Sequence, residues 1–279
     1  MLSQADLSIE VPRLATALPP FPRVVQQLLE LLRDDELSIE TLARVARNDA
    51  VIAGQILSVA NHVRRLRLQS DLSDPFAAAA LIGLNRVRQI VVSAGMNRFV
   101  QVAAGSTPFF YAHSLAVAIA AQELAVLHEL PPEDAYIAGI LHDIGQLCFH
   151  VLAPAAYREV ADRAAVDGRL VEHEQAAFGY DHCLIGCLLA EHWHLPDGVL
   201  RAIATHHDEE APENRLQAVV MIAEVLTRAL DLPESPNNRV IHVNPLARDL
   251  LGIDFSSPAM LDCLGRCRAR YRLAFRKQE

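Results

Sequence analysis

The sequence lacks the features that mark secreted and membrane-spanning proteins. No uninterrupted apolar run reaches the roughly 18 residues that cross a bilayer. Gln122 and Glu123 interrupt one candidate run, and Gly83 with Asn85 ends another. The N-terminal residues, MLSQADLSIEV, also lack the charged start and apolar stretch of a secretion signal. We therefore expect a cytoplasmic protein with no membrane span.

Cysteine is scarce, and its arrangement excludes a disulfide framework. The chain has five cysteines, an odd number. Two pairs, Cys183 with Cys187 and Cys263 with Cys267, are spaced i, i+4 rather than as CxxC. This spacing places each pair on one face of a helix. We expect free thiols in a reducing compartment and no structural zinc knuckle.

Basic and aromatic residues are too few for a general nucleic-acid surface. The formal net charge is −9 and aromatic residues make up 5% of the chain, whereas binding to nucleic acid depends on positive charge. Two basic stretches are exceptions: RRLR at 64–67, and residues 266–277, which hold six positive residues and no acid. We expect the second stretch to be a solvated helix face, with an anionic partner as the alternative.

The pattern that is present is helical. Hydrophobic residues make up 52% of the chain and charged residues 21%, a balance typical of a protein with a packed core. Apolar residues recur at spacings of three and four, without sustained strand-type alternation, in segments 24–32, 39–46, 51–60 and 87–96. The prediction is an all-α, two-lobed helical protein with short connections.

The distribution of histidine predicts where the lobes divide. Ten of the 12 histidines fall within residues 113–207, after a run of small and polar residues. We therefore predict an N-terminal helical lobe over residues 1–105 and a histidine-rich, metal-binding helical lobe over 106–232. A Pro/Asn-rich turn at 232–238 then leads into a C-terminal extension over 233–279.

One polar pair lies inside an apolar segment. His142 and Asp143 belong to GILHDIGQL, residues 139–147, which is expected to be part of one helix. Neighbouring residues of a helix are about 100° apart, so both side chains can reach one point beside it. Gly139 and Gly145 flank the pair and would let another backbone or an ion approach closely. Taken alone, the pair fits either a metal site or an exposed, hydrogen-bonded pair.

Further imidazoles and a carboxylate occupy positions at or beside the inward faces of later predicted helices. Glu224 is the single acid in a strongly apolar helix, and burial of a carboxylate is costly unless it is paired or bound to a cation. Imidazoles together with carboxylates suit Fe, Mn, Zn, Ni or Co rather than Mg or Ca alone. The candidate residues for such a divalent transition ion are His113, His142, Asp143, His182, His206, His207 and Glu224.

These residues resemble a known family. His113, the HD pair and a later acid resemble the H…HD…D pattern of the HD superfamily of metal-dependent phosphohydrolases. The sequence also resembles the G-x-x-H-x-x-x-G…W-x-L-P…I-x-x-H-H signature of HDOD domains, and the resemblance covers about residues 14–230. The residues that carry the signature are Gly179, His182, Gly186, Trp193, Leu195, Pro196, Ile203, His206 and His207.

The resemblance implies a bacterial signalling or regulatory protein with a retained metal site of one or two ions. By comparison with the related HD-GYP phosphodiesterases, Asp143 would bridge two ions and be the candidate catalytic residue. Glu224 stands where the family has an aspartate. The other ligands would be His113, His142, His182 and one or both of His206 and His207. The partner would be a signalling protein or a nucleotide-like phosphoester, and nucleic acid is disfavoured.

The alternative implied by the resemblance is a metal-dependent phosphohydrolase that acts on a nucleotide or other phosphoester through a metal-activated water. Two features depart from the HD-GYP pattern. HHDEEAPEN, residues 206–214, stands where a GYP stretch is expected, which disfavours hydrolysis of cyclic di-GMP of that type. The chain has a single lysine, Lys277, so arginines such as Arg163 or Arg201 are the candidates for contacting a phosphate.

Overall fold

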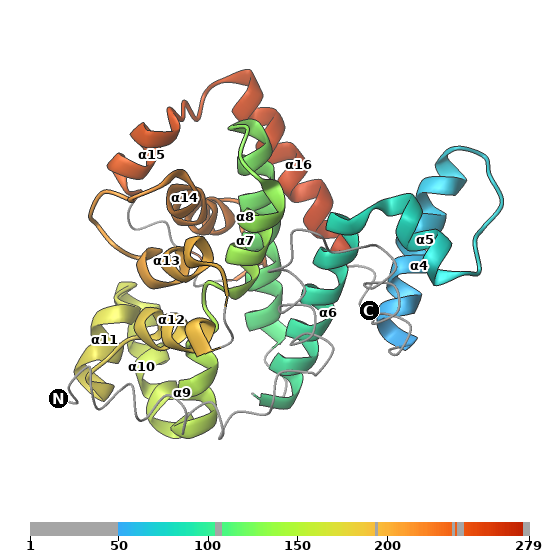
Figure 1. The fold of residues 1–279 in the computed structure, drawn as a ribbon. Coiled ribbons are helices and arrows are strands. Elements are labelled where there is room, and N and C mark those ends of the chain that lie inside the picture. Colours follow the sequence, from blue (N-terminus) through green and yellow to red (C-terminus); the bar gives the residue numbers. More distant parts are fainter. Residues whose placement is uncertain (1–49, 104–107, 193–194, 236–237, 239–242, 276–279) are drawn as a thin grey trace. The chain divides into compact units, whose positions relative to one another are not determined.

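The fold is entirely helical in the part of the chain that can be described. The computed structural model describes residues 50–103, 108–192, 195–235, 238 and 243–275. These residues form thirteen helices and no strand (Figure 1), which confirms the all-α prediction. Several sequence features lie outside the described residues, among them the predicted helices over 24–32 and 39–46, the signature residue Trp193 and Lys277.

The chain divides into two compact units, one over residues 20–99 and the other over residues 1–19 with 100–279. In the first unit, buried side chains that include Ile56, Ala79 and Val91 form one apolar core. The described helices that build it are α4 (Ala50–Leu66), α5 (Pro75–Ile82) and α6 (Leu84–Ala103), the last of which continues into the second unit.

The second unit is organised around one long helix. α7 packs against α8, α14 and α16 (Figure 1), and residues from α7, α8, α14, α15 and α16 share one buried apolar cluster. The helices of this unit are α7 (Pro108–Leu127), α8 (Pro132–Leu141), α9 (Gln146–Leu152), α10 (Pro154–Asp167), α11 (Leu170–Phe178), α12 (His182–His192), α13 (Asp197–Thr205), α14 (Arg215–Ala229), α15 (Pro245–Leu251) and α16 (Pro258–Phe275).

α7 and α8 form a tightly packed helical hairpin. Gly139 of α8 lies so close to α7 that a Cβ atom added to it would be 2.8 Å from the Cα atom of Ala118. Ala118 lies nine residues before the end of α7 and Gly139 seven residues after the start of α8, as expected for antiparallel packing. Glycine is needed at this position because any side chain would collide with the backbone of α7. This contact therefore fixes the position along α7 at which α8 ends.

Two apolar segments of this unit meet the length and composition of a membrane span, Phe109–Leu127 and Pro132–Leu152. They pass on mean apolar character, whereas the prediction concerned uninterrupted apolar runs, and Gln122 with Glu123 still interrupts the first segment. Within their apolar windows, 89% of the first and 78% of the second are buried inside the protein. Packing against neighbouring helices accounts for this apolar character, because a helix that is apolar on all sides is typical of the interior of a larger helical unit.

The basic C-terminal helix is tied to the core rather than fully solvated. Arg266 Nε donates to Glu123 Oε2 at 2.6 Å, and Arg270 pairs with Glu123 and Gln122. Cys263 of the same helix is fully buried in the apolar cluster around α7. The Arg266 and Arg270 side chains remain 47% and 31% exposed, so the predicted solvated face also supplies the partner that a carboxylate buried on α7 requires.

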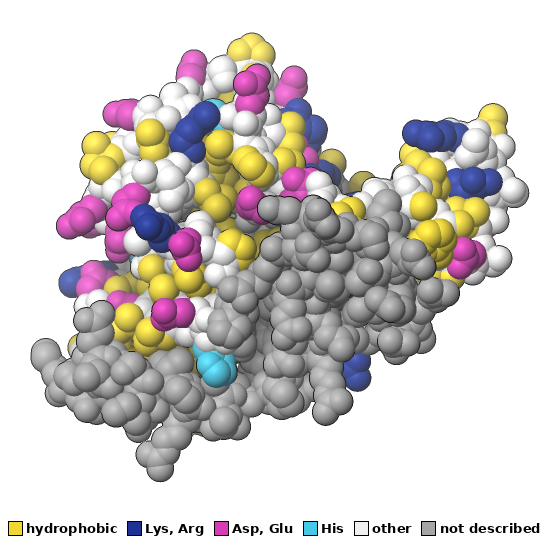
Figure 2. Space-filling model, viewed as in Figure 1, with side chains coloured by type: hydrophobic (Ala, Val, Ile, Leu, Met, Phe, Trp, Pro, Cys, Tyr) yellow, Lys and Arg dark blue, Asp and Glu magenta, His cyan; other side chains and the backbone are white. Residues whose placement is uncertain are grey.

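The RRLR stretch is also engaged within its own unit. Arg65 pairs with Asp71, and Arg64 donates to the backbone carbonyl of Ser70. On the face of the molecule drawn in Figure 2, acidic and basic side chains are interspersed. Neither observation favours a continuous positive surface of the kind that binds nucleic acid.

Candidate metal centre

His142 and Asp143 lie in a turn between two helices. α8 ends at Leu141, residues 142–145 form the turn, and α9 begins at Gln146. The backbone N–H groups of Ile144 and Gln146 donate to carbonyl groups three residues earlier, at 3.0 and 2.9 Å, which is tighter than the spacing of an α-helix. The prediction that one helix carries the pair was therefore wrong.

Gly145 allows the turn to pack closely against α12. A Cβ atom on Gly145 would be 2.0 Å from the carbonyl oxygen of His182 and 2.7 Å from the backbone nitrogen of Gly186. The turn thus packs backbone against backbone on α12, a distance that only glycine permits. This confirms the expectation that the flanking glycines allow another backbone to approach closely. The contact brings His182 next to the turn.

The seven predicted ligand residues come from five places in the chain and meet in one region. His113 lies on α7, the HD pair follows α8, and Glu224 lies on α14. His182 begins α12, and His206 with His207 follows the end of α13. His207 is exposed, whereas six residues are buried, namely His113, His142, Asp143, His182, His206 and Glu224.

The first group, termed the His113 cluster, consists of His113, His142 and Glu224. Nε2 of His113 lies 2.9 Å from Oε2 of Glu224, and Nε2 of His142 lies 3.4 Å from the same oxygen. Oδ2 of Asp143 lies 3.2 Å from Nε2 of His142 and 3.7 Å from Nε2 of His113. Four nitrogen and oxygen atoms therefore surround one point.

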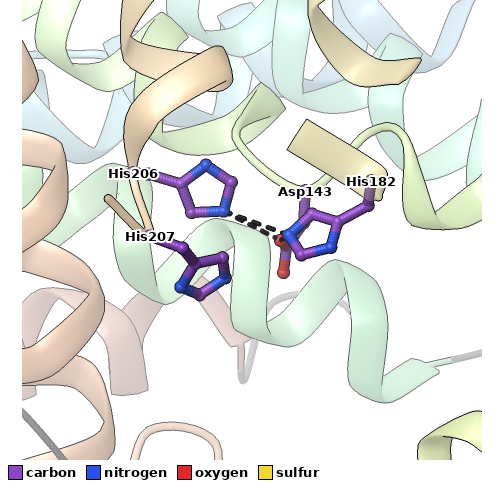
Figure 3. A group of neighbouring side chains, drawn as sticks. All are labelled: Asp143, His182, His206 and His207. Carbon is purple, nitrogen blue, oxygen red and sulfur yellow. Dashed lines mark hydrogen bonds and ion pairs between the residues drawn. The ribbon is translucent and has the colours of Figure 1, made fainter. Parts of the chain in front are cut away.

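The second group, termed the His182 cluster, consists of His182, His206 and His207 together with Asp143. Figure 3 shows the rings of His182 and His206 directed at the carboxylate of Asp143. Their Nε2 atoms lie 3.2 and 3.4 Å from Oδ1 of Asp143 and 3.3 Å from each other. Asp143 thus offers one oxygen to each cluster.

The residues fit a bound cation because the atoms that face the centre lack other partners. Nε2 of His113, Nε2 of His142, Oδ1 of Asp143 and Oε2 of Glu224 are buried without a hydrogen-bond partner. An unsatisfied buried polar group costs about 1–3 kcal/mol. Buried nitrogen and oxygen atoms that converge on a shared point without other partners are the arrangement that a metal ion satisfies.

The rings of His142 and His206 are oriented by hydrogen bonds from Nδ1, the ring nitrogen that faces away from the centre. Nδ1 of His142 donates to the carbonyl oxygen of Gly139, and Nδ1 of His206 donates to that of Ile203, each at 2.8 Å. A carbonyl oxygen only accepts hydrogen bonds, so Nδ1 carries the proton and the Nε2 lone pair faces the centre. Metal-binding histidines are held in this way.

The clusters also attract positive charge. Burial would lower the pKa of His142, but the neighbouring Asp143 and Glu224 raise it to about 9. Burial would likewise lower the pKa of His206, but Cys183 and Asp143 beside it raise it to about 10. Although burial opposes it, the facing His142 holds the pKa of Asp143 well below its usual range. The centre therefore takes up protons readily, and protons and metal ions compete for the same lone pairs.

Two residues that contact the ligands were missed in the sequence. Oε2 of Glu174 accepts hydrogen bonds from His182, and Arg228 Nε donates to Oε1 of Glu224 at 2.6 Å. The i, i+4 spacing of Glu224 and Arg228 was a usable signal, whereas nothing in the sequence connects Glu174 to His182. The arginines predicted to contact phosphate, Arg163 and Arg201, instead pair with exposed glutamates.

The fold is shared with solved bacterial structures. An HDOD domain protein with unknown function from Geobacter sulfurreducens is 22% identical, with coverage of 97% of this chain and 98% of that chain and a TM-score of 0.73. A candidate phosphohydrolase from Shewanella amazonensis SB2B is 23% identical, with coverage of 97% and 99% and a TM-score of 0.71. At these identities the likeness shows the fold alone.

Longer proteins contain a similar segment. An uncharacterized protein of Treponema pallidum (strain Nichols) is 25% identical over 245 residues, which are 81% of this chain and 46% of that protein. The chain therefore spans less than half the length of this curated relative. In sequence, the HDOD domain family matches residues 18–209, which is more than half of the chain. On this match and the shared fold, the chain belongs to the HDOD domain family.

Proposed function

We propose that the chain is a metal-dependent phosphohydrolase whose active site is the pair of clusters around Asp143. The observation that carries the proposal is the placement of Asp143, which has Oδ2 3.2 Å from His142 Nε2 and Oδ1 3.2 Å from His182 Nε2. A carboxylate with one oxygen directed at each of two ligand sets is suited to bridge two ions. The names of two Shewanella amazonensis SB2B structures, a candidate phosphohydrolase and a candidate metal-dependent phosphohydrolase, support the reaction class.

The donor set favours a transition metal. Imidazole nitrogens predominate in both clusters and carboxylates complete them, a combination that suits Fe, Mn, Zn, Ni or Co. Bound divalent ions supply a water nucleophile of lowered pKa and polarise the phosphoryl group. Asp143 holds the two sites at a fixed separation. His207 is the exposed member of the His182 cluster.

Arg228 is the side chain best placed to bind the phosphoryl group of a substrate. Its Nε is held by Oε1 of Glu224, the oxygen opposite the one that faces the His113 cluster. The Arg228 side chain is 36% exposed, and within the described part of the chain its Nη groups have no partner. A guanidinium with two free NH2 groups matches phosphate geometry.

A regulatory role is the second candidate. A candidate signal transduction protein from Marinobacter aquaeolei VT8 shares the fold with a TM-score of 0.72 at 19% identity, and this chain covers 60% of its length. Some relatives extend well beyond the matched segment, which supports a regulatory module whose state is recognised by attached or partner domains. In this case the metal centre would hold the module in a binding-competent form without turnover.

One experiment separates the two candidates. The purified full chain, loaded in turn with Mn²⁺, Fe²⁺, Co²⁺, Ni²⁺ or Zn²⁺, would be assayed for phosphate release from a panel of phosphomonoesters and phosphodiesters. The phosphohydrolase proposal predicts metal-dependent turnover of at least one member, which Asp143→Ala abolishes. Stoichiometric metal with no turnover on any member of the panel would reject the proposal and leave the regulatory role.

A further inference from the structure

His182 differs from the other buried ligands in how its ring is held. His142 and His206 follow the ends of helices, so a carbonyl group three residues earlier accepts their Nδ1 protons. His182 is the first residue of α12, and the residues before it are not helical. No preceding turn of helix supplies its carbonyl. The chain must therefore provide another acceptor for Nδ1 of His182.

Glu174 is that acceptor. It lies on α11, is fully buried, and its Oε2 accepts hydrogen bonds from Nδ1 of His182 at 2.6 Å and from the His182 backbone N–H at 2.9 Å. The backbone contact also satisfies one of the N–H groups that the first turn of a helix leaves without a partner. A single carboxylate oxygen thus fixes both the start of α12 and the orientation of the imidazole.

The second oxygen of Glu174 is anchored as well. Oε1 accepts a hydrogen bond from the hydroxyl group of Tyr157 on α10 at 2.9 Å. The Tyr157 ring stacks on Phe149, with ring centroids 5.1 Å apart, and Phe149 stacks on Phe178 at 4.6 Å. Three aromatic side chains from α9, α10 and α11 therefore hold the carboxylate in place behind the metal centre, in a chain with few aromatics.

We propose that Glu174 is a positioning residue that, anchored by Tyr157, orients His182 and sets the metal affinity of the His182 cluster but not of the His113 cluster. The inference rests on the proposed metal centre and not on turnover. A carboxylate behind a metal-binding imidazole fixes its tautomer and raises its basicity, and loss of such a partner typically costs 10–100-fold in metal affinity. No residue of the His113 cluster contacts Glu174 among the hydrogen bonds of the described residues.

The test isolates each cluster before Glu174 is changed. In the full chain carrying His142→Ala, Zn²⁺ binds through the His182 cluster, and in the chain carrying His206→Ala it binds through the His113 cluster. Glu174→Gln keeps the shape of the side chain and removes its charge. Added to His142→Ala, it is expected to weaken Zn²⁺ binding about 10–100-fold. Added to His206→Ala, it is expected to leave Zn²⁺ affinity unchanged. Affinity would be measured by competition with a chromogenic chelator, without any substrate.

Controls address folding and site identity. Glu172→Gln on the same helix removes an exposed carboxylate that pairs with Arg169, and should change neither affinity. Tyr157→Phe, which leaves Glu174 charged, should weaken only the His182 cluster, by less than Glu174→Gln does. Equal losses in both backgrounds, or no loss in the first, would overturn the inference. Two bound ions without phosphate release would reject the proposed hydrolase while leaving this test intact.

Discussion

Oδ1 of Asp143 lies 3.2 Å from Nε2 of His182, while the other carboxylate oxygen of Asp143 faces His142. Because one side chain serves both clusters, removing it should affect both sites. We predict that Asp143→Ala loses two ions per chain, or binds both at least 100-fold more weakly, as measured by elemental analysis after dialysis. Asp249→Asn, an exposed change on α15, is the matched control and should retain both.

Gly145→Ala tests the backbone contact that builds the centre. The added methyl group would overlap the carbonyl oxygen of His182 at 2.0 Å, so the turn and α12 must separate. We predict a loss of roughly 1–3 kcal/mol or more in the free energy of unfolding, accompanied by weaker metal binding. Gly54→Ala is the control, because nothing lies within 4 Å of its added Cβ and alanine stabilises a helix interior by roughly 0.5–1 kcal/mol. Equal effects of the two changes in urea unfolding would contradict this account.

Arg228→Gln tests phosphate recognition apart from metal binding. Because Arg228 also holds the far oxygen of Glu224, a ligand of the His113 cluster, the variant is measured with metal in excess so that both sites stay filled. Hydrogen bonds to charged groups are worth about 1.5–3 kcal/mol, so the inhibition constant for inorganic phosphate should rise roughly 10–100-fold. Arg201→Gln, which removes an exposed pair with Glu213, should leave it unchanged. Unaltered phosphate affinity in Arg228→Gln would remove this residue from the site.

The stability of the metal-free chain should fall as pH rises. The pKa values of His142 and His206 are about 9 and about 10 in the folded protein, against roughly 6.5 when unfolded. A group whose pKa is raised by folding contributes stability that is complete below the unfolded pKa and is lost as pH rises through the folded pKa. Urea unfolding with a chelator present should therefore show decreasing stability from about pH 6.5 to about 10. A flat or rising profile over that window would contradict the prediction.

The metal-loaded chain should respond in the opposite direction. The ions need unprotonated imidazoles, so their affinity should increase over the same pH range, while protons are released on binding. Potentiometric titration of the chain with Zn²⁺ near neutral pH should detect those protons. Uptake of the metal without proton release would show that the rings of His142 and His206 are already neutral.

The sequence predicted which residues meet but not the backbone that brings them together. Spacing and composition were sufficient for an all-α fold, and the inward positions of His113 and Glu224 followed from helical periodicity. The turn at His142 and Asp143 was missed because it depends on contact between Gly145 and α12, which are distant in the sequence. Periodicity describes one helix at a time, so a helix interrupted by a tertiary contact still reads as continuous.

The residues behind the ligands were missed for a related reason. Glu174 has the pattern of an ordinary polar residue of a short helix, and only its contact with the first residue of α12 in the folded chain makes it a partner of His182. The pairing of the basic C-terminal helix with Glu123 was missed similarly, because the burial of Glu123 on α7 is not visible from residues 266–277. Contacts between residues of different helices can be identified only in the packed fold, whereas the face of a helix on which a residue lies can be predicted from the sequence of that helix.

Metal stoichiometry decides whether Asp143 joins two separate metal sites. Elemental analysis of the full chain should give two transition ions per protein, one ion in His142→Ala and one in His182→Ala, because each variant disables one cluster. His173→Ala, which removes a histidine paired with Asp167 outside both clusters, should keep two. A single ion in the unaltered chain, lost in both cluster variants, would contradict the two-site account.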